Sequence, residues 1–203
     1  MPKIVDKNVM KAYIVNAALK AFLKYGFHKT TMSKIASEAE IAKGTLYIYF
    51  KSKEQLISNI TSLHFEKLTS NLITKEYFQT LDDFLQHIEN TLLISEADTQ
   101  FIPIFFEAFG SQFSSADFMK EYKILFHNIG VFYKKNLQFL IDKHQIKDTI
   151  NPATLGRVLV SMIDGIILHK GFFKMNNTEY KTMIKDAIEL FKFGMQEINM
   201  EIS

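Results

Sequence analysis

Residues 43–53, KGTLYIYFKSK, bring cationic, phenolic and hydroxyl groups together within about three helical turns. If a helix begins near Lys43 and turns by about 100° per residue, Leu46 and Phe50 fall on one side, where a core can cover them. The opposite side then carries a small residue, a hydroxyl, a branched apolar group, two phenols and a cation: Gly44, Thr45, Ile48, Tyr47, Tyr49 and Lys43. Ammonium, hydroxyl and phenol groups bind phosphate oxygens, and a branched apolar group can contact a thymine methyl. The chemistry of this face therefore favours a nucleic acid over a protein core.

Side chains that would support catalysis or metal binding are sparse. Asp83 and His87 lie four residues apart, as metal ligands can, but the polar neighbours Asp82, Gln86 and Glu89 favour a solvated helix face. The chain has no cysteine, no Gly-rich phosphate loop and no nucleophile elbow. We therefore expect no enzyme activity, no metal and no cofactor. A helical small-molecule enzyme and a DNA-free helical adaptor protein remain the alternatives.

The net charge of +2 on 203 residues conceals an uneven distribution. Residues 1–56 hold ten lysines and four acids, a net of +6, whereas the remainder holds 14 basic and 18 acidic residues, a net of −4. A basic segment attracts phosphates through counterion release, although lysines also keep a small domain soluble. No run of 18 uncharged apolar residues is present, so we expect a cytoplasmic protein with no membrane partner.

Runs with helical periodicity dominate the chain, and the hairpin dipeptide Asn-Gly is absent. The predicted helices span 8–25, 32–39, 43–50, 53–73, 80–95, 98–113, 115–143, 152–170 and 177–199. Their predicted N-caps are side chains that can accept a backbone N–H: Thr31, Ser52, Thr80, Asp98, Ser115 and Asn151. We therefore predict an all-α fold with an N-terminal three-helix head and a larger helical body.

The second and third predicted helices have the spacing of a helix–turn–helix. Ile35, Ala36 and Ala39 recur at helical spacing before a tight connection, and the small alanines allow another helix to cross closely. In this geometry the second helix of the pair enters a DNA major groove. An ordinary helical hairpin inside an all-α domain has the same spacing, so spacing alone leaves both interpretations open.

Residues 30–56, TTMSKIASEAEIAKGTLYIYFKSKEQL, resemble the signature of TetR-family transcriptional regulators, in which the pattern TT…IA..A…..GTLY.YF.SKE.L runs through helices two to four. The resemblance implies a DNA-binding domain over 1–52 and an effector-binding and dimerisation domain over 53–203. It further implies a homodimer that binds double-stranded operator DNA, as a repressor released by a small molecule. The rest of the chain matches the family only in length and helical character.

The resemblance also implies roles for individual residues. Thr31 matches a residue that meets a phosphate at a helix N-terminus, and Lys53 matches a phosphate-contacting lysine. Lys43, Gly44 and Thr45 match the residues that enter the groove. Tyr47 and Tyr49 match phenols that contact phosphates. The single arginine, Arg157, lies far from this segment in the sequence, so any contact to a guanine must come from Lys43. Ile48 is suited to contact a thymine methyl. We infer an operator that leans towards A/T.

Two residues depart from the family pattern. Glu40 stands where a turn glycine is usual, and a positive φ there would strain a glutamate by about 1 kcal/mol. Ala42 stands where a Ser or Thr usually caps the recognition helix, so a cap worth about 1 kcal/mol is missing.

The body is rich in aromatic residues, with Pro103 inside an apolar run. Packing in a core accounts for each aromatic side chain taken singly, and an aromatic-lined effector pocket accounts for their concentration. We predict a mostly apolar or aromatic effector, bound by Phe105, Phe106, Glu107, Phe109, Phe126, His127 and Tyr133.

The last predicted helix carries two adjacent apolar stripes, one through Ile184 and Ile188 and the other through Met183, Ala187, Leu190 and Gly194. One stripe can pack on the body and the other on a partner, and the sequence does not decide which. We predict a four-helix dimer interface that involves Leu159, Met162, Ile166, Ile184, Ile188, Phe191 and Met195.

Overall fold

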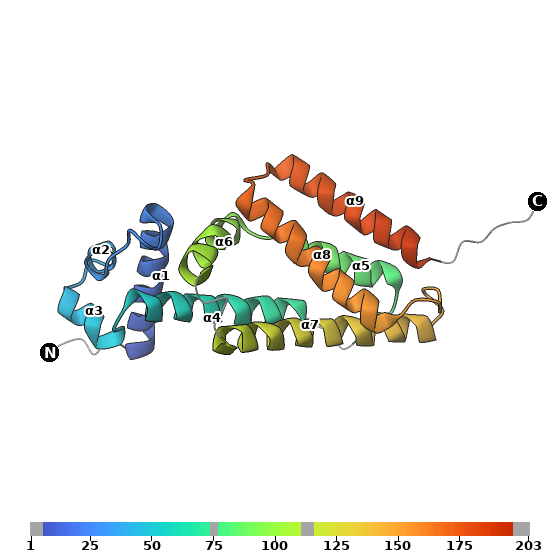
Figure 1. Ribbon diagram of the computed structural model, residues 1–203, viewed down its shortest axis with the longest axis horizontal. Coiled ribbons are helices and arrows are strands. Elements are labelled where there is room, and N and C mark those ends of the chain that lie inside the picture. Colours follow the sequence, from blue (N-terminus) through green and yellow to red (C-terminus); the bar gives the residue numbers. More distant parts are fainter. Residues whose placement is uncertain (1–5, 74–76, 111–115, 197–203) are drawn as a thin grey trace, which may run out of the picture. The chain divides into compact units, whose positions relative to one another are not determined.

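The computed structural model describes residues 6–73, 77–110 and 116–196, and this part of the chain forms helices and no strand (Figure 1). The helices are α1 Lys7–Tyr25, α2 Met32–Glu38, α3 Lys43–Tyr49, α4 Lys53–Leu72, α5 Leu81–Leu92, α6 Glu96–Phe109, α7 Ala116–Asp142, α8 Pro152–Phe172 and α9 Asn177–Met195. The predicted all-α fold is confirmed, and the predicted helix boundaries agree to within a few residues.

The chain packs as two compact units that do not follow the linear order of the sequence. Unit 1 comprises Met1–Leu68 and Gln100–Ser115, and unit 2 comprises Thr69–Thr99 and Ala116–Ser203. Two helices, α4 and α6, therefore begin in one unit and end in the other. The division at residue 52 that we expect between DNA-binding and effector-binding functions stays a prediction.

The head, α1–α3, is built on small and branched apolar residues. Ile14, Ala18 and Phe22 of α1 are fully buried, as are Ile35 of α2 and Leu46 of α3. Gly26 is the C-cap of α1 and has a φ of 78°, a conformation that favours glycine. A core of this kind holds α2 against α1 and α3 against α2.

Unit 2 depends on a close crossing between α7 and α8. A Cβ at Gly156 would lie 3.0 Å from the Gly130 carbonyl oxygen and 3.1 Å from the Lys134 amide nitrogen, so a larger residue there would require α7 to move slightly away. Helix α5 buries one side against this pair, and the Tyr180 hydroxyl of α9 donates to the Leu92 carbonyl oxygen at 2.6 Å. That bond ties α9 to the end of α5.

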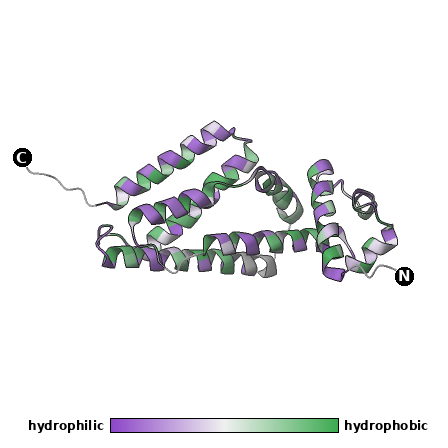
Figure 2. Ribbon diagram, turned by 180° about the vertical axis from the view of Figure 1, so that it is seen from behind, coloured by the Kyte–Doolittle hydropathy of each residue, from purple (hydrophilic) through white to green (hydrophobic). Residues whose placement is uncertain are grey.

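Apolar and polar residues alternate along the helices in Figure 2. Helix α8 consists mostly of apolar residues. By length and composition α8 could cross a membrane, a property that core helices of soluble proteins share. Seven residues of α8 are buried inside the chain: Gly156, Leu159, Val160, Ile163, Ile166, Lys170 and Gly171. The ammonium of buried Lys170 donates to the Met175 carbonyl oxygen and to Asn177 Oδ1, so this internal charge is paired.

Several helix ends test the predicted caps. Thr31, Thr80 and Asn151 each accept a backbone N–H as predicted, and Pro152 is the first residue of α8. The prediction for Asp98 is wrong, because α6 begins at Glu96 and the Ser95 hydroxyl accepts the Asp98 amide. Helix α6 continues through Pro103. The predicted cap Ser115 and the predicted helix ends at 113 and 199 lie outside the described residues.

Candidate nucleic-acid interface

The connection between α2 and α3 is a tight turn in a left-handed conformation. Glu40 has a φ of 50°, and the Ile41 amide donates to the Ala36 carbonyl oxygen at 3.0 Å. Buried Ala36 and Ala39 present only methyl groups to this turn, which lets α3 cross close to α2. The glutamate therefore occupies a position that glycine adopts with less strain.

We expect Glu40→Gly to raise the free energy of unfolding by about 1 kcal/mol, because glycine reaches this φ at no steric cost. Urea denaturation of the full chain measures the change. Glu40→Ala is the matched control, since alanine also lacks the charge but keeps the strain. An equal gain in both variants would assign the effect to the glutamate side chain and not to the backbone.

Helix α3 buries its apolar side in the head and exposes the opposite side. Leu46 and Phe50 are buried in the head, while Ile48 is 71% exposed. Tyr47 is exposed, and the Lys43 ammonium lies 5.9 Å from the centre of its ring. The predicted orientation of α3 is thus confirmed, and an exposed isoleucine on a short helix is suited to contact a partner.

The ends of α2 and α3 differ in how they are capped. The Thr31 hydroxyl accepts the Lys34 amide at 3.3 Å, and its own O–H stays able to donate to a phosphate. Ala42 forms no side-chain cap bond at α3, as predicted from the sequence. Gly44 and Lys43 are exposed beside it, and Thr45 and Tyr49 are half-buried. All eight predicted DNA-binding residues belong to unit 1, and their contacts with DNA stay predictions.

Lys53, the first residue of α4, makes contacts that the sequence did not reveal. Its ammonium donates to the carbonyl oxygens of Phe27 and His28, at 2.9 Å and 3.1 Å. An ammonium has three N–H groups, so one is left for a phosphate. The Glu107 carboxylate of α6 accepts the His28 amide at 2.9 Å. This pairing spans 79 residues of sequence, and no local pattern could have indicated it.

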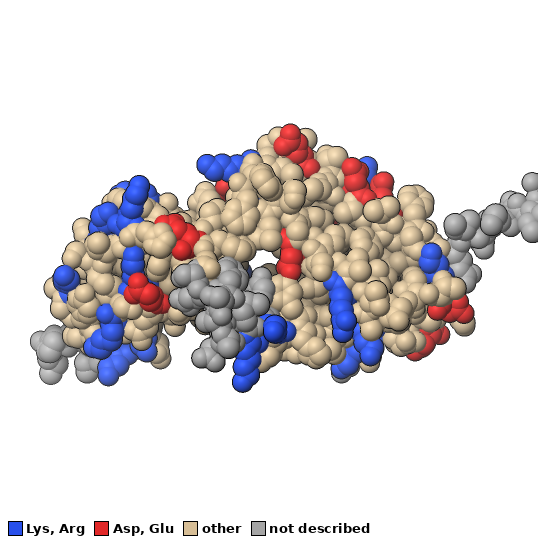
Figure 3. Space-filling view, in the orientation of Figure 1, with Lys and Arg blue, Asp and Glu red and all other residues tan. Residues whose placement is uncertain are grey.

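Positive charge is concentrated where the interface is predicted. Lys and Arg side chains stand out on the head in Figure 3, in keeping with the net of +6 over residues 1–56. Each lysine that neutralises a phosphate releases a counterion, so a surface of this kind binds DNA with a steep salt dependence.

The predicted effector residues fall in both packing units. In unit 1, the Phe105 ring centre lies 5.3 Å from that of Phe106 and 5.2 Å from that of Phe109. Glu107 is engaged by the head, as described above. In unit 2, Tyr133 is fully buried, Phe126 is half-buried and His127 is exposed. The structure thus brings the three phenylalanines of α6 together, while the effector role of the set stays a prediction.

The predicted dimer residues lie mainly on the side of α8 and α9 that faces the chain's own core. Leu159, Ile166, Ile184 and Met195 are buried within the protomer, and Met162, Ile188 and Phe191 are half-buried. These four buried residues pack in the core of the protomer, and the dimer role of the predicted set stays a prediction.

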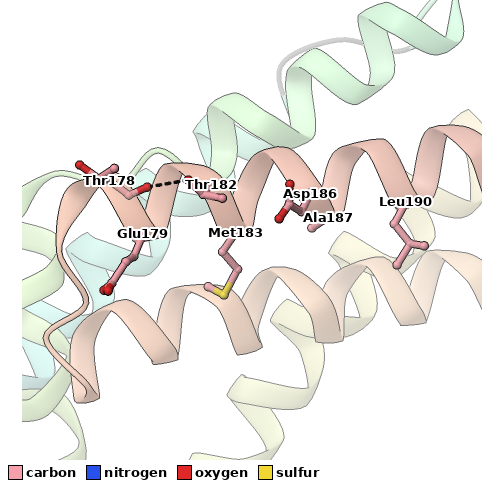
Figure 4. Close-up of a pocket in the computed structure, with 7 residues that line it drawn as sticks. All are labelled: Thr178, Glu179, Thr182, Met183, Asp186, Ala187 and Leu190. Atoms are coloured by element: carbon pink, nitrogen blue, oxygen red, sulfur yellow. Dashed lines mark hydrogen bonds between the residues drawn. The ribbon is translucent and has the colours of Figure 1, made fainter.

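The other apolar stripe of α9 is more exposed: Met183 and Ala187 are half-buried, and Leu190 and Gly194 are exposed, as is the neighbouring Phe193. Leu190 is 71% exposed and Phe193 is 72% exposed. An open groove of ≈ 590 Å³ runs along this side of α9 (Figure 4), lined by Thr178, Glu179, Thr182, Met183, Asp186, Ala187 and Leu190. On α8, Val158 and Phe172 are exposed as well. Exposed apolar side chains of this size on two helices mark an interaction surface.

Within the described residues, no three His, Asp or Glu side chains gather as metal ligands would. Asp83 is exposed on the surface of α5. The His87 ring instead packs against the Phe78 ring, with 4.8 Å between the ring centres.

Known proteins match both the head and most of the chain. The sequence model of the family described as "Bacterial regulatory proteins, tetR family" matches residues 14–60. The uncharacterized HTH-type transcriptional regulator YvdT of Bacillus subtilis is 26% identical over 191 residues, which are 91% of this chain and 94% of that protein. HTH-type transcriptional regulator UidR of Escherichia coli is 27% identical over 164 residues, 76% of this chain and 78% of that protein. A TetR transcription regulator from Haloarcula marismortui shares the fold, with a TM-score of 0.74 over 94% of this chain and 100% of that chain at 15% identity.

These matches agree with the geometry. The family segment begins in α1, includes α2 and α3, and ends in α4, so it contains the whole helix–turn–helix and its exposed face. The relatives that extend over the body are named as transcriptional regulators and not as enzymes. The chain is a TetR-family transcriptional regulator with an N-terminal helix–turn–helix for DNA binding.

Proposed function

We propose that the chain acts as a cytoplasmic homodimeric repressor. It binds a two-half-site operator through α3 and releases it when a small, mostly apolar or aromatic effector binds the body. The exposed face of α3 carries this proposal. Ile48, at 71% exposure, stands with Lys43 and Tyr47 on the side opposite buried Leu46. These exposed side chains do not pack in the protomer core. Their cationic, phenolic and apolar groups suit the phosphates and base edges of a DNA major groove.

The proposed dimer is supported by the apolar side chains that α8 and α9 leave exposed. Val158, Leu190 and Phe193 are exposed on these two helices, and a twofold axis would cover the same residues on both copies. The sites of a homodimer then recur one helical turn of DNA apart or at multiples of it. The proposed interface is the Met183, Ala187, Leu190 and Gly194 stripe together with Val158.

The effector proposal is supported by the aromatic content of the body. Phe101, Phe105 and Phe109 of α6 form one cluster of tilted rings, in which the ring centres of Phe101 and Phe105 are 6.4 Å apart. Phe78, Phe84 and Phe132 surround Tyr133 and His87 in unit 2. An effector releases DNA only if it binds the DNA-incompetent state more tightly than the DNA-binding state. A difference of a few kcal/mol between these two binding free energies suffices.

Selection from random double-stranded oligonucleotides tests the proposed function directly. The expected result is an enriched palindromic site whose affinity falls steeply with salt, because each head contacts several phosphates. Failure to enrich any sequence would remove the proposal. Thermal-shift screening of small molecules, followed by release of the bound site, tests the effector part.

We expect Ile48→Ala to weaken binding by about 1 kcal/mol at one base step and to relax the base preference there, because a thymine methyl loses its contact. Gel-shift titration against the selected site and its single-base variants measures this. Val9→Ala is the matched control, since Val9 is an exposed apolar residue of α1 outside the predicted interface. An equal loss on every sequence would show that Ile48 does not read a base.

A further inference from the structure

The two helices that cross between the packing units, α4 and α6, hold the same two residues of the head. Lys53 of α4 donates to the carbonyl oxygens of Phe27 and His28, at 2.9 Å and 3.1 Å. Glu107 of α6 accepts the His28 amide at 2.9 Å. The turn between α1 and α2 is thus bound by a cation at its carbonyl oxygens and by an anion at its amide. Both charged residues belong to helices that have residues in unit 2 as well.

The turn has hydrogen bonds of its own and places a glycine beneath the carboxylate. A Cβ on Gly26, whose φ is 78°, would come within 3.3 Å of both carboxylate oxygens of Glu107, so the carboxylate lies directly over this glycine. The Thr30 hydroxyl lies 2.6 Å from the Gly26 carbonyl oxygen and 3.2 Å from that of Ala21, in position to donate to either. A turn fixed in this way moves as one body with whatever holds it.

Glu107 is charged in this setting. Burial by itself raises the pKa of Glu107, but the backbone amides of His28 and Phe27, aided by the charges of His28 and Lys53, lower it below its ordinary value. Charge-assisted hydrogen bonds from backbone N–H groups to a carboxylate are stronger than neutral ones. The carboxylate is therefore a firm attachment point at neutral pH.

The gripped turn leads straight into the DNA-binding helices. Phe27 is buried and its ring centre lies 5.3 Å from that of Phe22, which anchors the turn to α1. Thr31, three residues after His28, caps α2, and α2 in turn supports α3. A rotation of the turn would consequently change the angle at which α3 meets DNA.

We propose that Glu107 and Lys53 form a clamp on the Phe27–His28 turn, and that Glu107 is a positioning residue for operator binding. Glu107 lies on α6, outside the helix–turn–helix, and acts through the angle at which the head is held. The inference rests on the proposed function, since it takes a dimer with two heads as given. One head can bind one half-site at any angle, whereas two heads bind two half-sites only if each is held at the right angle.

The experiment compares wild type, Glu107→Gln and Glu107→Ala on three kinds of duplex: the operator selected from random sequences, a single half-site, and operators with one base pair added or removed between half-sites. We expect Glu107→Ala to bind the half-site within twofold of wild type and the full operator about tenfold more weakly, and to discriminate less between spacings. Glu107→Gln keeps an acceptor oxygen and is expected to fall between the two. Glu66→Ala, which removes an exposed carboxylate of α4, is the matched control.

Two results would overturn the clamp. One is a Glu107→Ala protein with wild-type affinity and wild-type spacing preference. The other is an equal loss on half-site and full operator together with a lowered melting temperature, because that pattern describes a general structural defect.

Hydrogen exchange at the His28 amide separates failure of the clamp from failure of the proposed function. The amide is expected to exchange at least tenfold faster in Glu107→Ala than in wild type without DNA, because it loses its acceptor. Unchanged exchange would overturn the clamp even if operator binding is normal. Faster exchange in a protein that selects no DNA would keep the clamp and reject its role in operator binding.

Discussion

An Asp164→Asn variant is expected to be about 2–4 kcal/mol more stable than wild type at pH 8 and to lose most of that advantage at pH 4. Asp164 lies on α8 and is half-buried. Burial raises the pKa of this carboxyl from 3.8 to about 7. Asparagine has nearly the same shape and carries no charge, so it avoids the cost of a desolvated carboxylate.

The direction of the pH effect follows from proton binding. The folded state keeps the Asp164 proton up to about pH 7, whereas the unfolded state loses it near pH 3.8. Wild-type stability is therefore highest with respect to this group at pH values below the unfolded pKa, and it falls as the pH rises towards 7. Above pH 7 the penalty is complete, which is why the variant gains most there.

Urea denaturation at pH 4, 6 and 8 measures this difference. Asp148→Asn is the matched control, because Asp148 is an exposed aspartate in the α7–α8 connection. A gain from Asp164→Asn that is the same at all three pH values would contradict a cost of ionisation and would point to a packing effect instead.

The second large effect is expected at the uncovered face of α9. We expect Leu190→Glu to be a folded monomer and to bind the full operator at least 100-fold more weakly than wild type. Leu190 is 71% exposed, so a glutamate there leaves the protomer core intact. In a twofold dimer the substitution introduces two like charges into an apolar contact, and the two heads are then no longer linked.

Analytical ultracentrifugation and circular dichroism measure the oligomeric state and the fold of this variant. Lys185→Glu is the matched control, because it adds negative charge about 140° away around α9, where the side chain is solvated. A dimeric Leu190→Glu protein would remove this stripe from the interface. Ile184→Glu is not informative, because Ile184 is buried in the protomer and its loss would unfold the body.

Local chemistry made part of this structure predictable. Thr31, Thr80 and Asn151 each bond to a backbone amide two or three residues ahead, so their capping is determined within one turn. The orientation of α3 follows from Leu46 and Phe50, which are the large apolar residues that share one side. The positive φ of Glu40 agrees with the glycine that the family pattern has at this position.

Other features depend on contacts that are remote in sequence. Ser95 and Asp98 are both good caps, and they bond to each other, so composition alone could not decide which of them begins α6. The two apolar stripes of α9 are similar in composition, and only packing against α5 and α8 shows that Ile184 is buried while Leu190 is exposed. Glu107 belongs to an aromatic run that resembled a pocket wall, yet its partner is a turn 79 residues earlier.

The hydrogen bond between Tyr180 and the end of α5 has a consequence for the order of events during protein synthesis. The partners are 88 residues apart. Ribosomes add about 5–20 residues per second, so α9 is synthesised on the order of ten seconds after α5. During that time the buried side of α5, formed by Leu81, Phe84, Leu85, Ile88 and Leu92, lacks part of its cover. A nascent chain stalled before α9 would therefore offer a chaperone or a protease an apolar helix that the finished protein hides.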